Sequence, residues 1–237
     1  MSLSKLKKFL EKPLNAPDSL KFTPVLLTSS KGFSLRNHLD IIECLGYKFD
    51  FYCKAGAKFD QSYSWLTKNL SGIIDKHGNI TLYIWLGTCD ITTKRGPFIS
   101  LSHSTDEECS DYCKFHIDRL VKFISTFSKV KLVFLEIPPY SIRVWNAYKG
   151  HANPESYNQQ DVILENRIEI LNSYIKDINC RLGVHSLNFR CDLLQYKRAG
   201  RKPVINYSLY KDGIHPSPVL ARFWMKRLVA KAFVDCC

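Results

Sequence analysis

The chain has 237 residues, of which 45% are hydrophobic and 24% are charged. This length and apolar content fit one α/β domain with a substantial core, or two small domains. The formal net charge of +12 suits a nucleic acid or an anionic surface as partner, although a basic protein without such a partner can carry it too.

No apolar run approaches the length that a bilayer crossing needs, and the first eight residues carry charges where a signal peptide would be apolar. We therefore expect a cytoplasmic protein, or a piece cut from a longer polypeptide. The nine cysteines have an odd count and irregular spacing, so we expect reduced thiols and no disulfide framework.

Short apolar runs alternate with helical patterns along the chain. The predicted strands are, in chain order, 22–27, 47–53, 81–86, 131–137 and, more weakly, 183–189. The predicted helices are 30–45, 60–74, 107–127, 161–178 and 218–234. The fourth helix has leucines and isoleucines at 4-3-4-3 spacing, and the last begins with Ser217 and Pro218, which suit an N-cap and a first helical position.

Continuously apolar strands that alternate with helices are typical of a parallel sheet covered on both faces. We expect an α/β fold, a three-layer α/β/α sandwich with a five-stranded, mostly parallel sheet. Residues 1–20 are predicted as a basic N-terminal extension and residues 21–237 as the domain. Residues 138–160 and 190–211 are long polar loops, which often carry function.

Chemistry-bearing residues follow the carboxyl ends of the predicted strands, where parallel sheets bind ligands. Asp212 and His215 form an acid–imidazole pair in a loop stiffened by Gly213 and Pro216. The aspartate can fix the tautomer of the histidine, which can then act as a general base. Ser30 lies at the turn from the first strand to a helix, where its own backbone N–H and the helix N-terminus favour developing negative charge.

Four sequence blocks, spread over about residues 22–234, together resemble the SGNH (GDSL-type) hydrolase family. That family has Gly-Asp-Ser after strand one, a glycine after strand two, Gly-x-Asn-Asp after strand three and Asp-x-x-His before the last helix. The corresponding blocks here are Thr28-Ser29-Ser30, Gly56, Gly87-Thr88-Cys89-Asp90 and Asp212-Gly213-Ile214-His215.

The resemblance implies the flavodoxin-like SGNH-hydrolase fold and hydrolysis of a small carboxylic ester through an acyl-serine, with no metal or other cofactor. It implies Ser30 as the nucleophile, His215 as its base and Asp212 as the residue that orients the base. The backbone N–H groups of Ser30 and Gly56 would form the oxyanion hole. The remaining residues that we assign to substrate binding are Gly87, Thr88 and Asp90.

Two positions depart from the family pattern. Cys89 stands in place of the asparagine of the third block, and a lost oxyanion donor costs about 10²–10³ in rate. A thiol donates weakly and cannot replace an amide. Ser29 stands in place of the aspartate of the first block. We therefore expect a slow or unusual esterase, or a catalytically degenerate binding or assembly module. This chain is also similar to esterase-like domains of mobile-element proteins, in its basic charge and in the sequence motifs Ser-Lys-Gly and Gly-Thr-x-Asp.

Other assignments stay open at this level. Asp212 and His215 could form a purely structural hydrogen bond, and Ser30 could be only a helix N-cap. Ser29 is a rival nucleophile, and Cys89 could be a nucleophile if the histidine faces it.

Two further clusters could bind a metal or a polyanion. Cys109, Cys113 and His116, with His103 nearby, have the residue types of a zinc site, but a stripe shared with Leu120 favours packing in the core. A basic cluster before the dyad could follow a phosphate backbone, or simply be a solvated loop. Its members are Lys197, Arg198, Arg201 and Lys202. Lys31 and Arg36, beside the proposed nucleophile, favour an anionic substrate.

Overall fold

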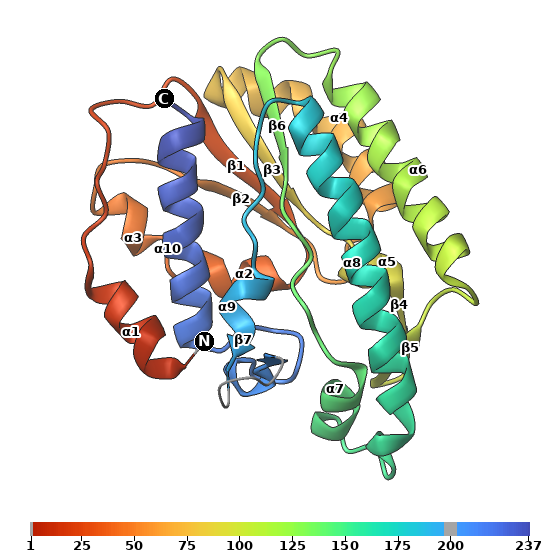
Figure 1. Ribbon diagram of the computed structural model, residues 1–237. Coiled ribbons are helices and arrows are strands. Elements are labelled where there is room, and N and C mark those ends of the chain that lie inside the picture. Colours follow the sequence, from red (N-terminus) through yellow and green to blue (C-terminus); the bar gives the residue numbers. More distant parts are fainter. Residues whose placement is uncertain (1, 197–202) are drawn as a thin grey trace.

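The computed structural model describes residues 2–196 and 203–237 and has three layers, with a parallel sheet between two layers of helices (Figure 1). The order of the sheet is β2-β1-β3-β6, and every neighbouring pair is parallel. The strands are β1 (Thr23–Thr28), β2 (Asp50–Cys53), β3 (Ile80–Trp85) and β6 (Val130–Phe134). All positions of the central strand β3 are buried, as expected for a strand covered on both faces. The predicted fold class is confirmed.

One face of the sheet is covered by three long helices (Figure 1). They are α4 (Phe59–His77), α6 (Asp106–Ile124) and α8 (Asn158–Arg181). Leu66, Ile117 and Ile168, one from each helix, belong to the same buried cluster as Leu82 of β3. Burial of a side chain of this size stabilises the fold by about 1.5–3 kcal/mol.

The other face is covered mainly by α10 and by shorter helices (Figure 1). They are α1 (Leu3–Glu11), α2 (Lys31–Arg36), α3 (Asp40–Glu43), α9 (Arg190–Leu193) and α10 (Pro218–Asp235). Trp224 of α10 packs edge-on against Trp85 of β3, with ring centroids 5.7 Å apart. The hydroxyl of Ser217 accepts the N–H of Leu220, so the predicted start of this helix is confirmed.

Helix α1 lies within the segment that the sequence analysis assigns to a basic extension. Leu6 is completely buried against α10. The ammonium of Lys226, on α10, donates to the carbonyls of Phe9, Leu10 and Lys12 at the end of α1. The carbonyl of Phe9 also accepts the N–H of Lys12 at 3.3 Å, while the cation adds a donor for the other carbonyls at the helix end. The domain boundary at residue 20 stays a prediction.

Two asparagines of α8 hydrogen-bond the free edge of the sheet. Asn179 accepts the N–H of Phe134 at 3.0 Å and donates to its carbonyl at 2.7 Å. Asn172 accepts the N–H of Ile137 at 2.7 Å and donates to its carbonyl at 2.9 Å. Each side-chain amide therefore takes the place that a residue of a neighbouring strand would take.

The fifth strand predicted at 183–189 is wrong, because the sheet has four strands among the described residues. This segment instead contacts the sheet edge through side chains. Ser186 accepts the N–H of Glu136 at 2.8 Å, and Phe189 is completely buried in the core. Because side chains already satisfy the edge, no backbone ladder forms there.

The sequence analysis misses several short elements at the carboxyl edge of the sheet. After β3 come α5 (Thr88–Ile91) and a hairpin of β4 (Thr92–Arg95) and β5 (Phe98–Leu101). The loop after β6 contains α7 (Ile142–Tyr148), whose Asn146 hydrogen-bonds both backbone groups of Ile99 at 2.9 Å. The other short elements are η1 (Pro154–Tyr157), β7 (Leu194–Gln195), β8 (Val204–Ile205) and η2 (Tyr207–Leu209). The predicted helix 30–45 is divided into α2 and α3.

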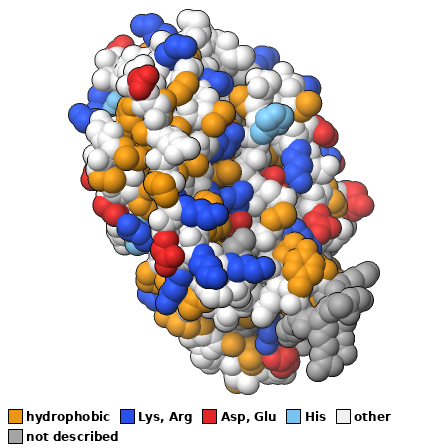
Figure 2. Space-filling view, turned by 60° about the vertical axis from the view of Figure 1, so that its left-hand side comes forward, with side chains coloured by type: hydrophobic (Ala, Val, Ile, Leu, Met, Phe, Trp, Pro, Cys, Tyr) orange, Lys and Arg blue, Asp and Glu red, His pale blue; other side chains and the backbone are white. Residues whose placement is uncertain are grey.

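Figure 2 shows lysine and arginine side chains that gather near the middle of one face. The predicted basic cluster of Lys197, Arg198, Arg201 and Lys202 lies outside the described residues. None of the helices in the described part combines the length and the apolar character that a membrane crossing requires.

Candidate active site

The structure brings Ser30, His215 and Asp212 into one hydrogen-bonded chain at the carboxyl edge of the sheet. Ser30 Oγ lies 2.8 Å from His215 Nε2, and His215 Nδ1 lies 2.8 Å from Asp212 Oδ2. Ser30 directly precedes α2, and the other two residues lie in the loop that precedes α10. Residues 185 positions apart in the sequence therefore meet in the order nucleophile, imidazole, carboxylate.

Three hydrogen bonds fix the carboxylate of Asp212. Its Oδ1 accepts the backbone N–H groups of Ile214 at 3.0 Å and of His215 at 2.8 Å. Burial acts to raise the pKa of Asp212, but the hydrogen bonds from the ring and backbone of His215 outweigh it and hold the pKa below its ordinary value. An ionised carboxylate can only accept a hydrogen bond, so it keeps the ring proton on Nδ1 of His215 and leaves Nε2 free to accept the Ser30 hydroxyl.

Gly213 lets the dyad loop pack against α7. Its φ is 90°, and a Cβ there would lie 2.8 Å from Val144 Cγ1 and 3.0 Å from the backbone nitrogen of Trp145. The carbonyl of Gly213 accepts the N–H of Ser141 at 3.1 Å. The Trp145 ring then lies 5.7 Å from the ring of His215. A side chain at position 213 would move the histidine away from α7.

The local backbone directs the hydroxyl of Ser30 toward the histidine. Ser30 is the N-cap residue of α2, but its side chain makes no capping hydrogen bond. Gly32 allows α2 to approach β1, because a Cβ there would lie 2.1 Å from Thr28 Cγ2. Ser29 is buried, and the serine that hydrogen-bonds His215 is Ser30.

A cavity of about 340 Å³ opens beside the serine and the histidine. Its lining includes the predicted residues Gly56, Thr88 and Cys89, but not Gly87 or Asp90. Within the described chain, the backbone N–H groups of Ser30 and Gly56 donate to no other group. Both residues line the cavity, and their role as oxyanion donors stays a prediction.

The cavity also has a buried lysine, Lys31, which is 2% exposed. Its ammonium donates to the Thr88 hydroxyl at 2.5 Å and lies 5.4 Å from the centroid of the Trp85 ring. Burial lowers the pKa of Lys31 to about 8, against the opposing charges of Cys89 and Asp90. Burial also raises the pKa of the Cys89 thiol.

Asp90 is turned away from the cavity. It is 1% exposed, and its Oδ1 accepts the N–H of Phe59, the first residue of α4, at 3.0 Å. Its Oδ2 has no hydrogen-bond partner among the residues that the structure describes. Burial raises the pKa of Asp90 to about 7. This carboxyl therefore supports the start of α4, while its predicted role in substrate binding stays a prediction.

The other wall residues are ones that the sequence analysis did not assign to the site. Lys58 precedes α4, Lys94 and Ile99 lie in the β4–β5 hairpin, Trp145 lies on α7, and Ile214 lies in the dyad loop. The hairpin has a sequence signal, since Gly and Pro at 96–97 separate two short runs with threonine, phenylalanine and isoleucine. Trp145 and Ile214 lie in the loop 138–160 and in the dyad block, which the sequence analysis singles out, and Lys58 has no such signal.

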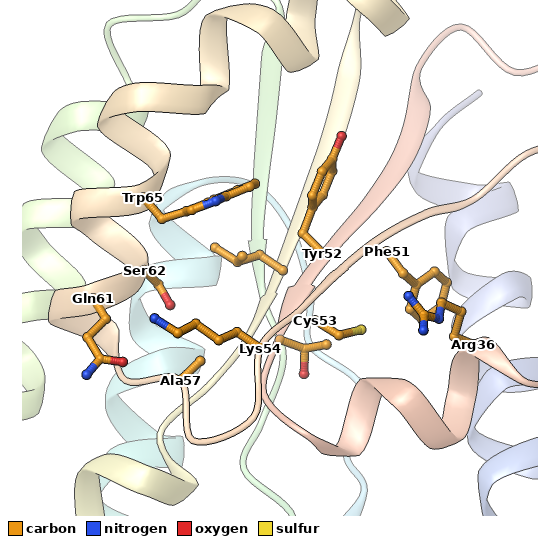
Figure 3. A pocket seen from close by; sticks show the side chains of 11 residues that line it. Arg36, Phe51, Tyr52, Cys53, Lys54, Ala57, Gln61, Ser62 and Trp65 are labelled. Carbon is orange, nitrogen blue, oxygen red and sulfur yellow. The ribbon is translucent and has the colours of Figure 1, made fainter.

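A second cavity of about 240 Å³ lies beside β2, across the loop 54–57 from the first. Figure 3 shows Lys54 extending toward Ser62 of α4, with Arg36 and Phe51 grouped beside α2. Tyr52 and Trp65 form its aromatic wall, with ring centroids 5.0 Å apart. Neither the serine nor the histidine of the first cavity takes part in its lining.

The cluster of Cys109, Cys113 and His116 is part of the helical core. Cys109 and Cys113 are completely buried, and the ring of His116 packs against Tyr112 with centroids 4.5 Å apart. Desolvation lowers the pKa of His116. Across residues 2–196 and 203–237, no three His, Cys, Asp or Glu side chains form a group that could hold a metal ion.

The sequence itself matches no model of a known protein family and no curated protein. Solved structures are similar. A lipase/acylhydrolase from Enterococcus faecalis superposes with a TM-score of 0.58 and 12% identity, covering 91% of this chain and 97% of that one. The acetyl xylan esterase AlAXEase superposes with a TM-score of 0.57 and 12% identity, covering 88% of this chain and 98% of that one. A protein from Slackia heliotrinireducens described as a candidate SGNH hydrolase superposes with a TM-score of 0.53 and 15% identity, covering 89% of this chain and 98% of that one.

The chain therefore has the fold of the SGNH/GDSL-type lipases, acylhydrolases and esterases, at an identity that marks it as divergent. The resemblance inferred from the four sequence blocks is confirmed at the level of the fold.

Proposed function

We propose that this protein hydrolyses carboxylic esters through an acyl-serine intermediate on Ser30. The observation that carries the proposal is the hydrogen-bonded chain from Asp212 through His215 to Ser30, which ends in the cavity. The similar structures named lipase/acylhydrolase and acetyl xylan esterase support the same reaction class.

In the acylation step, Ser30 Oγ attacks the ester carbonyl while His215 Nε2 takes the hydroxyl proton. Asp212 stabilises the imidazolium that forms. The carbonyl oxygen becomes an oxyanion and receives the N–H groups of Ser30 and Gly56. The carbon–oxygen bond to the alcohol then breaks, and the alcohol leaves with the proton from His215. A water molecule, activated by the same histidine, attacks the acyl-serine and releases the acid.

This proposal is tested by labelling with a fluorophosphonate, which reacts with activated serines. We expect one adduct per chain, located by peptide mass spectrometry at Ser30 and absent from the Ser30→Ala variant. The Ser29→Ala variant should still label, because Ser30 is the residue bonded to His215. A non-catalytic binding module would neither label nor hydrolyse short-chain aryl esters, and that result would exclude the esterase.

The Cys89→Asn variant should raise kcat for aryl esters by at least about 10-fold, because an amide restores a side-chain donor that is typically worth about 10²–10³ in rate. The matched control is Cys89→Ala, which removes the thiol and adds no donor, and its kcat should stay within a few-fold of wild type. Loss of turnover in Cys89→Ala would instead make Cys89 the nucleophile. An unchanged rate in Cys89→Asn would place position 89 outside the oxyanion hole.

A further inference from the structure

The cavity beside Ser30 is strongly cationic. Lys31, Lys58 and Lys94 all contribute to its lining, and its described lining contains no aspartate or glutamate. Lys31 is buried at the level of Thr88, Lys58 is half-buried, and Lys94 is exposed on the hairpin. Three positive charges therefore meet in a space of about 340 Å³.

None of the three lysines is neutralised by a carboxylate within the described part of the chain. The ion pairs found there all involve other cations. Asp90, an acidic neighbour of Lys31 and Lys58, lies outside the lining, and burial raises its pKa to about 7. Lys31 is the desolvated one of the three, and a buried cation without counter-charge is costly to the free protein and attracts an anion strongly.

The cavity also has an apolar part. Ile99, Trp145 and Ile214 line it, and Trp145 packs beside the ring of His215. A ligand that fills this cavity therefore meets both carbon and lysine side chains. A purely apolar ester would leave the lysines without a partner.

We propose that the ester substrate carries an anionic group, a carboxylate or a phosphate, which the lysines of this cavity bind while the ester carbonyl lies at Ser30. The inference rests on the proposed esterase function and names the class of its substrate. Lys58 and Lys94 contact the anion, and the buried Lys31, which donates to Thr88, adds its positive charge.

The test compares esters that differ only in charge. p-Nitrophenyl butyrate and p-nitrophenyl hydrogen succinate share their leaving group and acyl length, and they differ in a terminal carboxylate. Phenyl acetate, p-acetoxybenzoate and p-acetoxyphenyl phosphate make the same comparison on the alcohol side and separate carboxylate from phosphate. We expect at least one anionic ester to exceed its neutral partner by about 10-fold or more in kcat/KM at low salt, with a ratio that falls as salt is added.

Charge reversal of two lysines tests their role directly, and the same change outside the cavity is the matched control. The double variant Lys58→Glu/Lys94→Glu should abolish or invert the preference for the anionic ester. The double variant Lys68→Glu/Lys122→Glu changes the net charge equally at exposed positions on α4 and α6, outside the cavity, and should keep the preference. Equal or better turnover of the neutral esters in every pair, or a preference that survives Lys58→Glu/Lys94→Glu, would overturn the inference.

A binding measurement separates this inference from the esterase itself. Calorimetry on the wild-type protein should show binding of succinate or inorganic phosphate, but not of the neutral succinamide. The Lys58→Glu/Lys94→Glu variant should lose it. If fluorophosphonate labelling fails and this binding is present, the esterase is excluded and the anion site stands. If neither anion binds and the neutral esters are turned over, the anion site is excluded and the esterase stands.

Discussion

The His215→Ala variant is expected to lower kcat for aryl esters by about 10⁴-fold or more. His215 is the group within reach of the Ser30 hydroxyl, and its Nε2 lies 2.8 Å from Ser30 Oγ. Without it the serine has no base, and the remaining rate comes from the oxyanion donors and from substrate binding. Asp212→Asn should cost about 10⁴ as well, because an amide can hold the imidazole in the wrong tautomer.

Steady-state kinetics with p-nitrophenyl butyrate measure both variants, and circular dichroism establishes that they fold. His185→Ala, at an exposed position away from the cavity, is the control and should keep full activity. The effects of Ser30→Ala and His215→Ala should be strongly non-additive, because residues of one triad act as a unit. A kcat within 10-fold of wild type for His215→Ala would remove the general base from the mechanism.

The Lys31→Met variant is expected to be more stable than wild type near pH 7. The pKa of Lys31 is lowered from 10.5 to about 8 by burial. Charging it in the folded state therefore costs about 3 kcal/mol, at about 1.4 kcal/mol per pH unit. Methionine has a similar shape and no charge, and replacing a buried charged group by an apolar one is often stabilising.

The pH dependence of this difference identifies its cause. The folded pKa of Lys31 lies below the unfolded value, so between pH 8 and pH 10.5 the unfolded chain binds more protons and the wild-type free energy of unfolding rises with pH. The part of the stability difference between Lys31→Met and wild type that comes from the charge of Lys31 should therefore fall from about 3 kcal/mol at pH 7 to under about 1 kcal/mol at pH 10. Tyrosines and cysteines also titrate in this range, but they do so in both proteins and cancel in the difference.

Urea unfolding of both proteins at several pH values measures this effect. Lys226→Met is the contrasting variant, because Lys226 donates to carbonyls at the end of α1, and its loss removes these hydrogen bonds, including the one to Leu10. The Lys226→Met variant should be less stable than wild type, whereas Lys31→Met should be more stable. A gain for Lys31→Met that does not change with pH would mean that packing, and not charge, is responsible.

The sequence predicts best those elements whose pattern is long and local. Helix α8 has regular apolar spacing from Leu164 to Ile178, about four turns, and β3 is apolar except for Thr81, so local pattern alone identifies both. Helix α7 and the β4–β5 hairpin are too short for a clear period, and they are held in place by distant partners such as Asn146. The fifth strand fails for the same reason, since side chains of α8, together with Ser186 of the segment itself, occupy the backbone groups of the sheet edge.

The site residues also divide into those that a local motif predicts and those that only the folded structure shows. Asp212 and His215 are three residues apart, and their hydrogen bond is local enough for a motif to predict. Ser30 is found through its place after a strand. Lys31 reads as an ordinary surface cation beside it, and only the assembled fold shows that it is buried against Thr88. The burial of a charge depends on what packs over it, and one sequence does not contain that information in local form.

The amides at the sheet edge also fix the alignment of α8. Asn172 and Asn179 are seven residues apart, which is roughly 10.5 Å along a helix. Their partners Ile137 and Phe134 are three residues apart, roughly 10 Å in an extended chain. Because these lengths match, both amides can pair at once only when the helix runs antiparallel to the strand in this one alignment. The same bonds leave no free backbone groups at these two residues, so a strand from another molecule has nothing to pair with there, and this edge is protected against aggregation.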